Sequence, residues 1–181
     1  MVYIVLGTGF EEMEAVVPCD LLRRAGVDAK FVGIGALDIV GSRGITVKAD
    51  CTEKEACWDE AEMIVLPGGL GGVASIQGSA VVMDAVKKAY EDGRFVAAIC
   101  AAPTILAKLG YTDGKEAVCY PGMEDEMGTA VMVDRGSVRD GKILTGRAAG
   151  SAFDFGLALI EALCGETVSR NVAADVVYSL S

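Results

Sequence analysis

The sequence alternates short, continuous apolar runs with segments of helical character, and this alternation constrains the fold more than any other feature. The apolar runs occupy residues 2–6, 29–34, 64–66 and 95–99. The segments with helical character occupy residues 11–25, 79–91, 101–109 and 151–164. Strands that are buried on both faces are continuously apolar, whereas half-exposed strands alternate apolar and polar residues. The pattern therefore predicts an α/β fold, with a mainly parallel sheet covered by helices on both faces.

Shorter elements are expected between these segments. Residues 39–48 predict a small hairpin or an excursion at the edge of the sheet, and residues 116–119, 131–133 and 142–145 predict further strands. Residues 124–126 form an acidic loop, and Ser151 followed by Asp154 matches a capping box at the start of the last helix. With 181 residues and no linker or repeat, the chain is expected to form a single domain over residues 1–181.

The composition excludes several classes of site and partner. The chain has no histidine, so it cannot build a Ser-His-Asp triad, a Cys-His dyad or a histidine-containing zinc site from its own residues. Its net charge of −10 disfavours nucleic acid as a partner. Residues 2–6 predict a first strand rather than a signal peptide, and Pro67 interrupts the longest uncharged stretch, residues 63–83. A cytoplasmic protein without a membrane span is expected.

Cys100 is the strongest candidate nucleophile among the six cysteines, none of which forms a CxxC pair. It lies directly between the apolar run 95–99 and a helical segment, and its neighbours two positions away are Ala98 and Ala102. A nucleophile elbow requires this order and small neighbours, because the nucleophile occupies a strained turn. A helix N-terminus favours thiolate, so this interpretation predicts an acidic, reactive thiol. The pattern fits a small buried residue equally well.

Glu14 is the second candidate, because it lies on the apolar side of its predicted helix. At 100° per residue, Glu14 shares that side with Val17 and Leu21, whereas Glu12 points the other way. A buried carboxyl beside Cys100 is expected to have a raised pKa and to exchange protons with the sulfur or with a substrate. Glu11 and Glu12 are interpreted as exposed first-turn carboxylates that favour the helix dipole.

A glycine-rich turn, Pro67-Gly68-Gly69-Leu70-Gly71-Gly72, follows the third apolar run. It matches neither a dinucleotide-binding motif nor a P-loop. Backbone N–H groups of Gly69 and Ala101 are candidates for an oxyanion hole beside Cys100. The alternative is a flexible connection between a strand and a helix.

Five separated blocks identify a resemblance that covers nearly the whole chain. They are GFEEMEAVVPCDLLRRAG, SRGITV, VLPGG, VAAICAAPTILAKLG and LTGRAAGSAFDFGLALIEAL. In this order they resemble the DJ-1 branch of the ThiJ/PfpI superfamily. The resemblance implies a flavodoxin-like three-layer sandwich and a homodimer, without metal or cofactor. It also implies that Cys100 is an oxidisable nucleophile, that Glu14 is a protonated acid bonded to it, and that Gly68, Gly69 and Ala101 surround a small-molecule pocket.

The resemblance extends to residues around that pocket. Arg43 and Arg24 match arginines near the family's site and dimer interface, and Arg147 matches a position lining the same region. Their guanidinium groups are candidates to hold a carboxylate or an oxidised sulfur, although ion pairing on the surface or at an interface is the alternative. Tyr120 stands where many relatives carry a histidine. This departure removes the base that peptidase-like relatives use, so a proton shuttle would have to pass through Glu14 or the Tyr120 hydroxyl.

Three functions are compatible with these residues. The first is glyoxalase III or deglycase activity on reactive dicarbonyls such as methylglyoxal, an aldehyde substrate that Cys100 would attack while Glu14 moves the proton. The second is a redox-sensing stress protein or chaperone that is regulated by oxidation of Cys100. The third, a cysteine amidase or peptidase, is disfavoured because the chain has no histidine.

Overall fold

The computed structural model describes residues 1–179 and has a central seven-stranded sheet. Across the sheet the strands are β10 (Ser137–Asp140), β11 (Ile143–Gly146), β7 (Phe95–Ile99), β6 (Met63–Leu66), β1 (Val2–Leu6), β2 (Ala29–Gly33) and β5 (Cys51–Thr52). Every neighbouring pair is parallel except β10 and β11, which are antiparallel. The mainly parallel sheet predicted from the sequence is confirmed.

The apolar runs form the centre of this sheet because both of its faces are covered. All side chains of β1, β6 and β7 are buried. Successive side chains of a strand point to opposite faces. Accordingly, Val2, Ile4 and Leu6 join one hydrophobic core, whereas Tyr3 and Val5 join the other.

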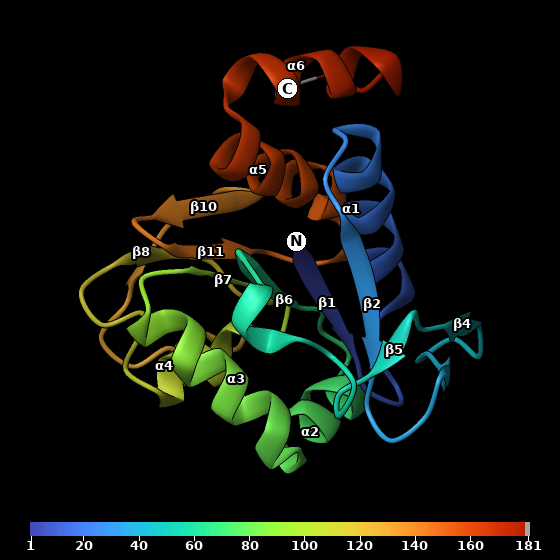
Figure 1. The fold of residues 1–181 in the computed structure, drawn as a ribbon. Helices are drawn as coiled ribbons and strands as arrows, with labels where there is room; N and C mark the ends of the chain where they lie inside the picture. Colours follow the sequence, from blue (N-terminus) through green and yellow to red (C-terminus); the bar gives the residue numbers. More distant parts are fainter. Residues whose placement is uncertain (180–181) are drawn as a thin grey trace.

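The helices divide between the two faces, so the molecule has three layers (Figure 1). One core includes residues of α1 (Glu12–Arg24), α5 (Ala152–Cys164) and α6 (Glu166–Asp175). The other includes residues of α2 (Leu70–Gly78), α3 (Ala80–Glu91) and α4 (Pro103–Lys108). This arrangement confirms the predicted α/β sandwich. Among the described residues, no helix is both long enough and apolar enough to cross a membrane.

Smaller elements surround the sheet. The predicted hairpin consists of β3 (Asp38–Val40) and β4 (Thr46–Lys48), which pair antiparallel. Two short strands, β8 (Glu116–Ala117) and β9 (Val131–Met132), pair in parallel. Single 3₁₀ turns span Trp58–Glu60 (η1), Glu124–Glu126 (η2) and Ala149–Ser151 (η3). The acidic loop is therefore a 3₁₀ turn.

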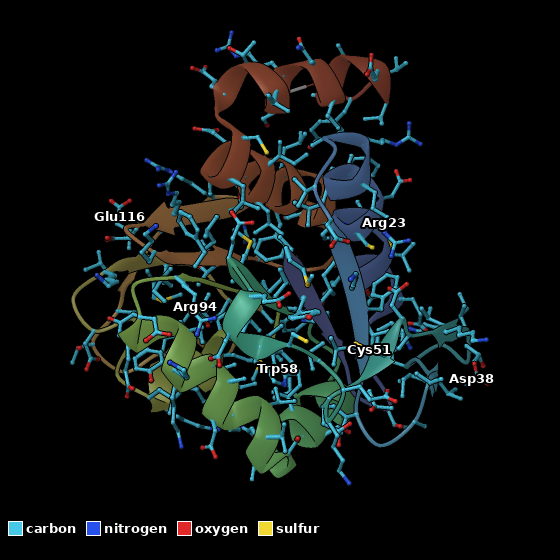
Figure 2. The ribbon with its side chains drawn as sticks, viewed as in Figure 1. Arg23, Asp38, Cys51, Trp58, Arg94 and Glu116 are labelled. Carbon is cyan, nitrogen blue, oxygen red and sulfur yellow. The ribbon has the colours of Figure 1, made fainter. Side chains whose placement is uncertain are left out.

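Two arginine side chains, both labelled in Figure 2, connect strands of the sheet to neighbouring segments. At the end of α1, Arg23 donates from Nε to the carbonyl of Ala29, 2.9 Å away in β2. Before β7, Arg94 donates from Nη1 to the carbonyl of Trp58, 2.7 Å away in η1. These bonds join segments that the sheet ladder alone does not connect.

The glycine-rich segment after β6 differs from the predicted turn. Its second half is the first turn of α2, which begins at Leu70 with Gly69 as its N-cap. A Cβ at Gly72 would lie 2.7 Å from Cα of Phe10, so that glycine permits close packing of the helix on the segment before α1. The alternative interpretation, a flexible connection, does not hold for residues 70–72, because they belong to α2.

The predicted capping box at Ser151 is also wrong. The Ser151 side chain makes no capping hydrogen bond, because the 3₁₀ turn Ala149–Ser151 runs directly into α5. The Asp154 carboxylate instead accepts a 2.6 Å hydrogen bond from the Tyr178 hydroxyl. Asp154, the residue predicted to complete the capping box, therefore contacts the segment after α6 instead.

Candidate active site

Cys100 lies immediately after β7, at the carboxyl edge of the sheet, where open α/β sheets place their ligands. Its φ of +67° is in the left-handed region, which is costly for a residue with a Cβ. The backbone is held on both sides: the N–H of Cys100 donates to the carbonyl of Gly146 (2.9 Å), and its carbonyl accepts from the N–H of Tyr120 (2.8 Å). The predicted strained elbow is confirmed.

Glu14 is fully buried in the first turn of α1, as its place in the apolar stripe predicts. Its Oε2 accepts a 2.8 Å hydrogen bond from the N–H of Gly68. Its Oε1 is also buried and has no hydrogen-bond partner among the described residues. The N-cap residue Glu11 accepts from the N–H of Glu14 at 3.0 Å and so fixes this turn. One carboxyl oxygen is thus anchored, and the other remains available.

Gly68 shows how closely the two candidates approach each other. A Cβ at this position would lie 2.6 Å from Oε2 of Glu14 and 2.7 Å from Cβ of Cys100. Both distances are too short for a side chain, so glycine is required here. The structure therefore brings Glu14, Gly68 and Cys100 together, although they come from three separate segments of the chain.

Burial changes the ionisation of both groups of the pair. It raises the pKa of Glu14 from 4.5 to about 7, against the opposing effect of the nearby Cys100 thiol and of the hydrogen bond from Gly68. Burial and, after it, the negative charge of Glu14 together raise the pKa of Cys100 to about 12. Backbone N–H groups of Ala101 and Gly69 hydrogen-bond the sulfur and act in the opposite direction.

The raised pKa of Glu14 agrees with the sequence prediction. The acidic thiol predicted at Cys100 is wrong, because the pKa of this thiol is raised. The helix that was expected to stabilise the thiolate begins only at Pro103 and has six residues. Desolvation and the neighbouring carboxylate therefore outweigh the two N–H groups at the sulfur. Above about pH 7 the pair is a thiol beside a carboxylate, and this carboxylate can accept the thiol proton.

The predicted backbone donors lie around the sulfur, and Tyr120 lies beside them. The N–H groups of Gly69 and Ala101 bond the sulfur, whereas the N–H of Gly68 is engaged by Glu14. Tyr120 is half-exposed and contacts Cys100 through its backbone. Gly69 has a φ of +81°, and this left-handed conformation shapes the turn that carries the N–H groups of Gly68 and Gly69.

The three predicted arginines have different surroundings. Arg24 lies at the far end of α1, about 15 Å along the helix from Glu14, and pairs with Asp20 (2.7 Å). Within one chain, the helix thus keeps Arg24 away from the Cys100–Glu14 pair. Arg147 follows β11, pairs with Asp134 and lines a separate cavity of about 240 Å³ with Cys119. Arg43 is exposed in the β3–β4 loop.

Glu12 has a structural role that the sequence interpretation missed. It was expected to be exposed, yet it is only 5% exposed, and it accepts hydrogen bonds from the N–H of Arg43 (2.7 Å) and of Ile45 (3.3 Å). Its partners lie about thirty residues later in the chain, beyond the reach of helical periodicity. Only the folded hairpin makes this carboxylate a buried one.

Comparisons with known proteins identify a family and similar structures. The family described as "DJ-1/PfpI family" matches residues 1–162. Protein dj-1beta of Drosophila melanogaster is 36% identical over 97% of this chain and 96% of that protein. The Parkinson disease protein 7 homolog of Danio rerio is 33% identical over 96% of this chain and 95% of that protein. The solved structure "Toxoplasma gondii DJ-1, oxidized" is 32% identical, covers 99% of this chain and 98% of that one, and has a TM-score of 0.93.

Proposed function

The chain belongs to the DJ-1/PfpI family, and from this membership we propose that it is a cofactor-independent enzyme that converts reactive dicarbonyls such as methylglyoxal into hydroxy acids. This is glyoxalase III chemistry, and it would protect against carbonyl stress. The observation that supports it most is the buried Glu14 carboxyl beside Cys100, because the reaction needs one nucleophile and one group that moves a proton.

The first step is addition of sulfur to the aldehyde. The Cys100 thiol gives its proton to the Glu14 carboxylate as the sulfur–carbon bond forms. Glu14 then passes this proton to the aldehyde oxygen, which gives a hemithioacetal and restores the carboxylate. Backbone N–H groups of Gly69 and Ala101 are positioned to stabilise negative charge at the sulfur or at the new oxygen.

The second step moves a proton between two adjacent carbons. Glu14 removes the proton from the former aldehyde carbon and returns it to the neighbouring carbonyl carbon, while the hydroxyl proton of the hemithioacetal moves to the neighbouring carbonyl oxygen. The product is a thioester of lactate. Water then cleaves the thioester, releases lactate and restores the thiol. The net change is addition of one water to methylglyoxal, so no external oxidant or reductant is required.

Lactate formation by the purified protein tests this proposal. Cys100→Ser is expected to abolish turnover, because it removes the nucleophile. Glu14→Gln is expected to lower kcat by at least about a hundredfold, because a proton-transfer group is lost. Cys119→Ser is the matched control, since Cys119 is a buried thiol outside the pair. If Cys100→Ser makes lactate as fast as the wild type, the proposal is wrong.

A redox function of the same cysteine is the second candidate. The two N–H groups at the sulfur favour an anionic sulfur, and a protonated Glu14 would donate to a sulfinate. The similar Toxoplasma gondii protein is described as oxidized. Two equivalents of peroxide would convert the thiol into sulfinic acid and release two waters. Mass spectrometry after limited peroxide treatment tests this: preferential oxidation at Cys19 or Cys164 would contradict it.

A further inference from the structure

Three hydrogen bonds join Glu11, Glu14 and Gly68 in a closed ring. The N–H of Glu14 donates to Oε2 of Glu11 at 3.0 Å. The N–H of Gly68 donates to Oε2 of Glu14 at 2.8 Å. The N–H of Glu11 donates to the carbonyl of Gly68 at 3.0 Å. Both the backbone and the carboxyl of Glu14 are therefore fixed by the same two residues.

The Glu11 side chain is the part of this ring that a substitution can remove while Glu14 and Gly68 stay unchanged. It acts as the N-cap of α1, where short polar side chains are preferred and most of these are uncharged. Glu11 makes the same capping bond with a partly exposed carboxylate. It thus adds a negative charge to the turn that carries Glu14.

The backbone of Glu11 also packs against a residue that donates to the sulfur. A Cβ at Gly69 would lie 2.7 Å from the nitrogen of Glu11 and 2.8 Å from the carbonyl carbon of Phe10, so no side chain fits there. The N–H of Gly69 hydrogen-bonds the Cys100 sulfur. A shift of Glu11 would therefore move a donor of the sulfur together with Glu14.

The charge of Glu11 acts on the Glu14 carboxyl as well. Burial is the main cause of the raised pKa of Glu14, and the negative charge of Glu11 raises this pKa in the same direction. The Cys100 thiol and the N–H of Gly68 oppose the rise. Glu11 therefore favours the protonated form of Glu14, in which the thiol lacks an acceptor for its proton.

The other charged groups of the elements around α1 have different partners or surroundings. Glu12 accepts hydrogen bonds from the β3–β4 loop, and the side chain of Arg43 in that loop is exposed. Residues 67–72, between β6 and the first turn of α2, include no ionisable side chain. Helix α5 packs on α1, but its carboxylates, Asp154 and Glu161, line a separate cavity with β10 and α6.

We propose that Glu11 is a positioning residue of the Cys100 site, which fixes Glu14 against the thiol and controls the transfer of the thiol proton to it. For turnover, which rests on the proposed function, a group that both removes and returns a proton works best when it changes protonation near neutral pH. Glu11 would keep Glu14 in that range. The reactivity of Cys100 is measurable without turnover.

The test is the rate at which iodoacetamide alkylates Cys100 at pH 6 and at pH 8. Peptide mass spectrometry follows Cys100, with the exposed Cys164 of the same molecule as an internal reference. A sulfur–carbon bond forms, iodide leaves, and the thiol proton passes to Glu14 and then to water. Glu11→Gln keeps an oxygen for the capping bond but removes the charge, so we expect the rate at pH 6 to rise about threefold.

Two further substitutions of Glu11 separate the capping bond from the charge. Glu11→Ala removes both and releases the first turn of α1, so the rate at pH 8 is expected to fall at least about threefold. Glu11→Asp keeps both and should restore the wild-type rate at both pH values. A wild-type rate at pH 8 in Glu11→Ala, or at pH 6 in Glu11→Gln, would overturn the proposal. So would an aspartate variant that behaves like the alanine variant.

Matched controls come from α3, on the other face of the sheet. Ser79 caps this helix by accepting from the N–H of Val82 at 3.4 Å, so Ser79→Ala removes a cap without touching the site. Asp84→Asn removes one exposed negative charge from the same helix. Both variants should leave the rates at Cys100 unchanged, and an effect equal to that of the Glu11 variants would contradict the proposal.

The outcomes also separate this inference from the proposed enzyme. If Glu11→Ala does not fold, Glu11→Gly replaces it, because glycine at an N-cap costs little stability. The expected alkylation rates without lactate formation would refute only the enzyme. Lactate formation with unchanged alkylation in all variants of Glu11 would refute only the role of Glu11.

Discussion

At the scale of single residues, Glu14 couples the stability of the fold to pH. Its pKa is raised from 4.5 to about 7 in the folded chain, so the folded state holds its proton more tightly than the unfolded state does. The resulting stabilisation is complete below about pH 4.5 and is lost as the pH rises through about 7. For the wild type we expect a loss of up to about 3 kcal/mol from this group between pH 4.5 and pH 8.

Urea unfolding of the wild type and of Glu14→Gln at several pH values measures this effect. The uncharged amide has no proton to lose, so the difference in unfolding free energy between the two proteins isolates Glu14 from all other titrating groups. We expect the variant to gain stability relative to the wild type as the pH rises. A difference that is independent of pH would show that burial of Glu14 does not disfavour its ionised form.

The reactivity of Cys100 is the second property set at this scale. Because the thiol needs an acceptor for its proton, its alkylation rate should rise as Glu14 ionises, with an apparent pKa of about 7 that belongs to the pair. Glu14→Gln should remove this rise of the rate near pH 7 and slow alkylation at pH 7.5 by at least about tenfold. Timed alkylation with iodoacetamide over pH 5–10 measures it, and an unchanged step near pH 7 in the variant would assign the step to another group.

At the scale of elements, the connection from β6 to α2 holds the pair in contact. Gly68→Ala places a Cβ between Glu14 and Cys100, so we expect a loss of stability of about 2 kcal/mol and at least about a tenfold slower alkylation of Cys100. Gly78→Ala is the matched control, because no atom lies within 4 Å of a Cβ at the end of α2. Equal effects of both substitutions in urea unfolding and alkylation would contradict this role of Gly68.

The elements also show how far sequence reasoning extends. Continuous apolar runs identified β1, β2, β6 and β7 because burial on both faces imposes that pattern locally. The helix α2 was missed because its glycines oppose helix formation, and close packing on Phe10 is what requires them. Neither β10 nor α6 was predicted, although Asp140-Gly141 marks the hairpin that ends β10.

The features of the candidate site also divide into those that local sequence patterns predict and those that depend on the fold. Cys100 and Glu14 were found because an elbow and a carboxyl in an apolar stripe are local patterns. The raised pKa of the Cys100 thiol and the hydrogen bonds that Glu12 accepts from the β3–β4 loop were missed. Each depends on residues that only folding brings together. Periodicity places a side chain on one side of a helix, but it does not reveal what covers that side.

At the scale of the whole molecule, one exposed apolar surface indicates how two chains would associate. Met13 and Val16 of α1 are 51% and 43% exposed, and Val40 and Ile45 of the hairpin are 46% and 58% exposed. The N–H of Gly9 donates to the carbonyl of Val40 at 2.8 Å, which brings the hairpin to the start of α1. We expect this surface to form the homodimer interface implied by the family resemblance.

Sedimentation at about 10 µM measures this association. Val16→Glu should shift the wild-type dimer toward monomer, since a charge would be buried without a partner. Val131→Glu is the control, because Val131 is similarly exposed (52%) but lies on β9. A monomeric wild type, or equal dissociation of both variants, would contradict this interface.

The left-handed backbone at Cys100 has a consequence for the evolution of the molecule. Glycine adopts a φ of +67° without the penalty of about 1 kcal/mol that a Cβ incurs, so the most heat-resistant version of this chain is expected to lack Cys100, its proposed nucleophile. A laboratory screen that rewards thermal tolerance alone would thus drift toward an inert protein. Cysteine persists at this position only where its chemistry is itself under selection.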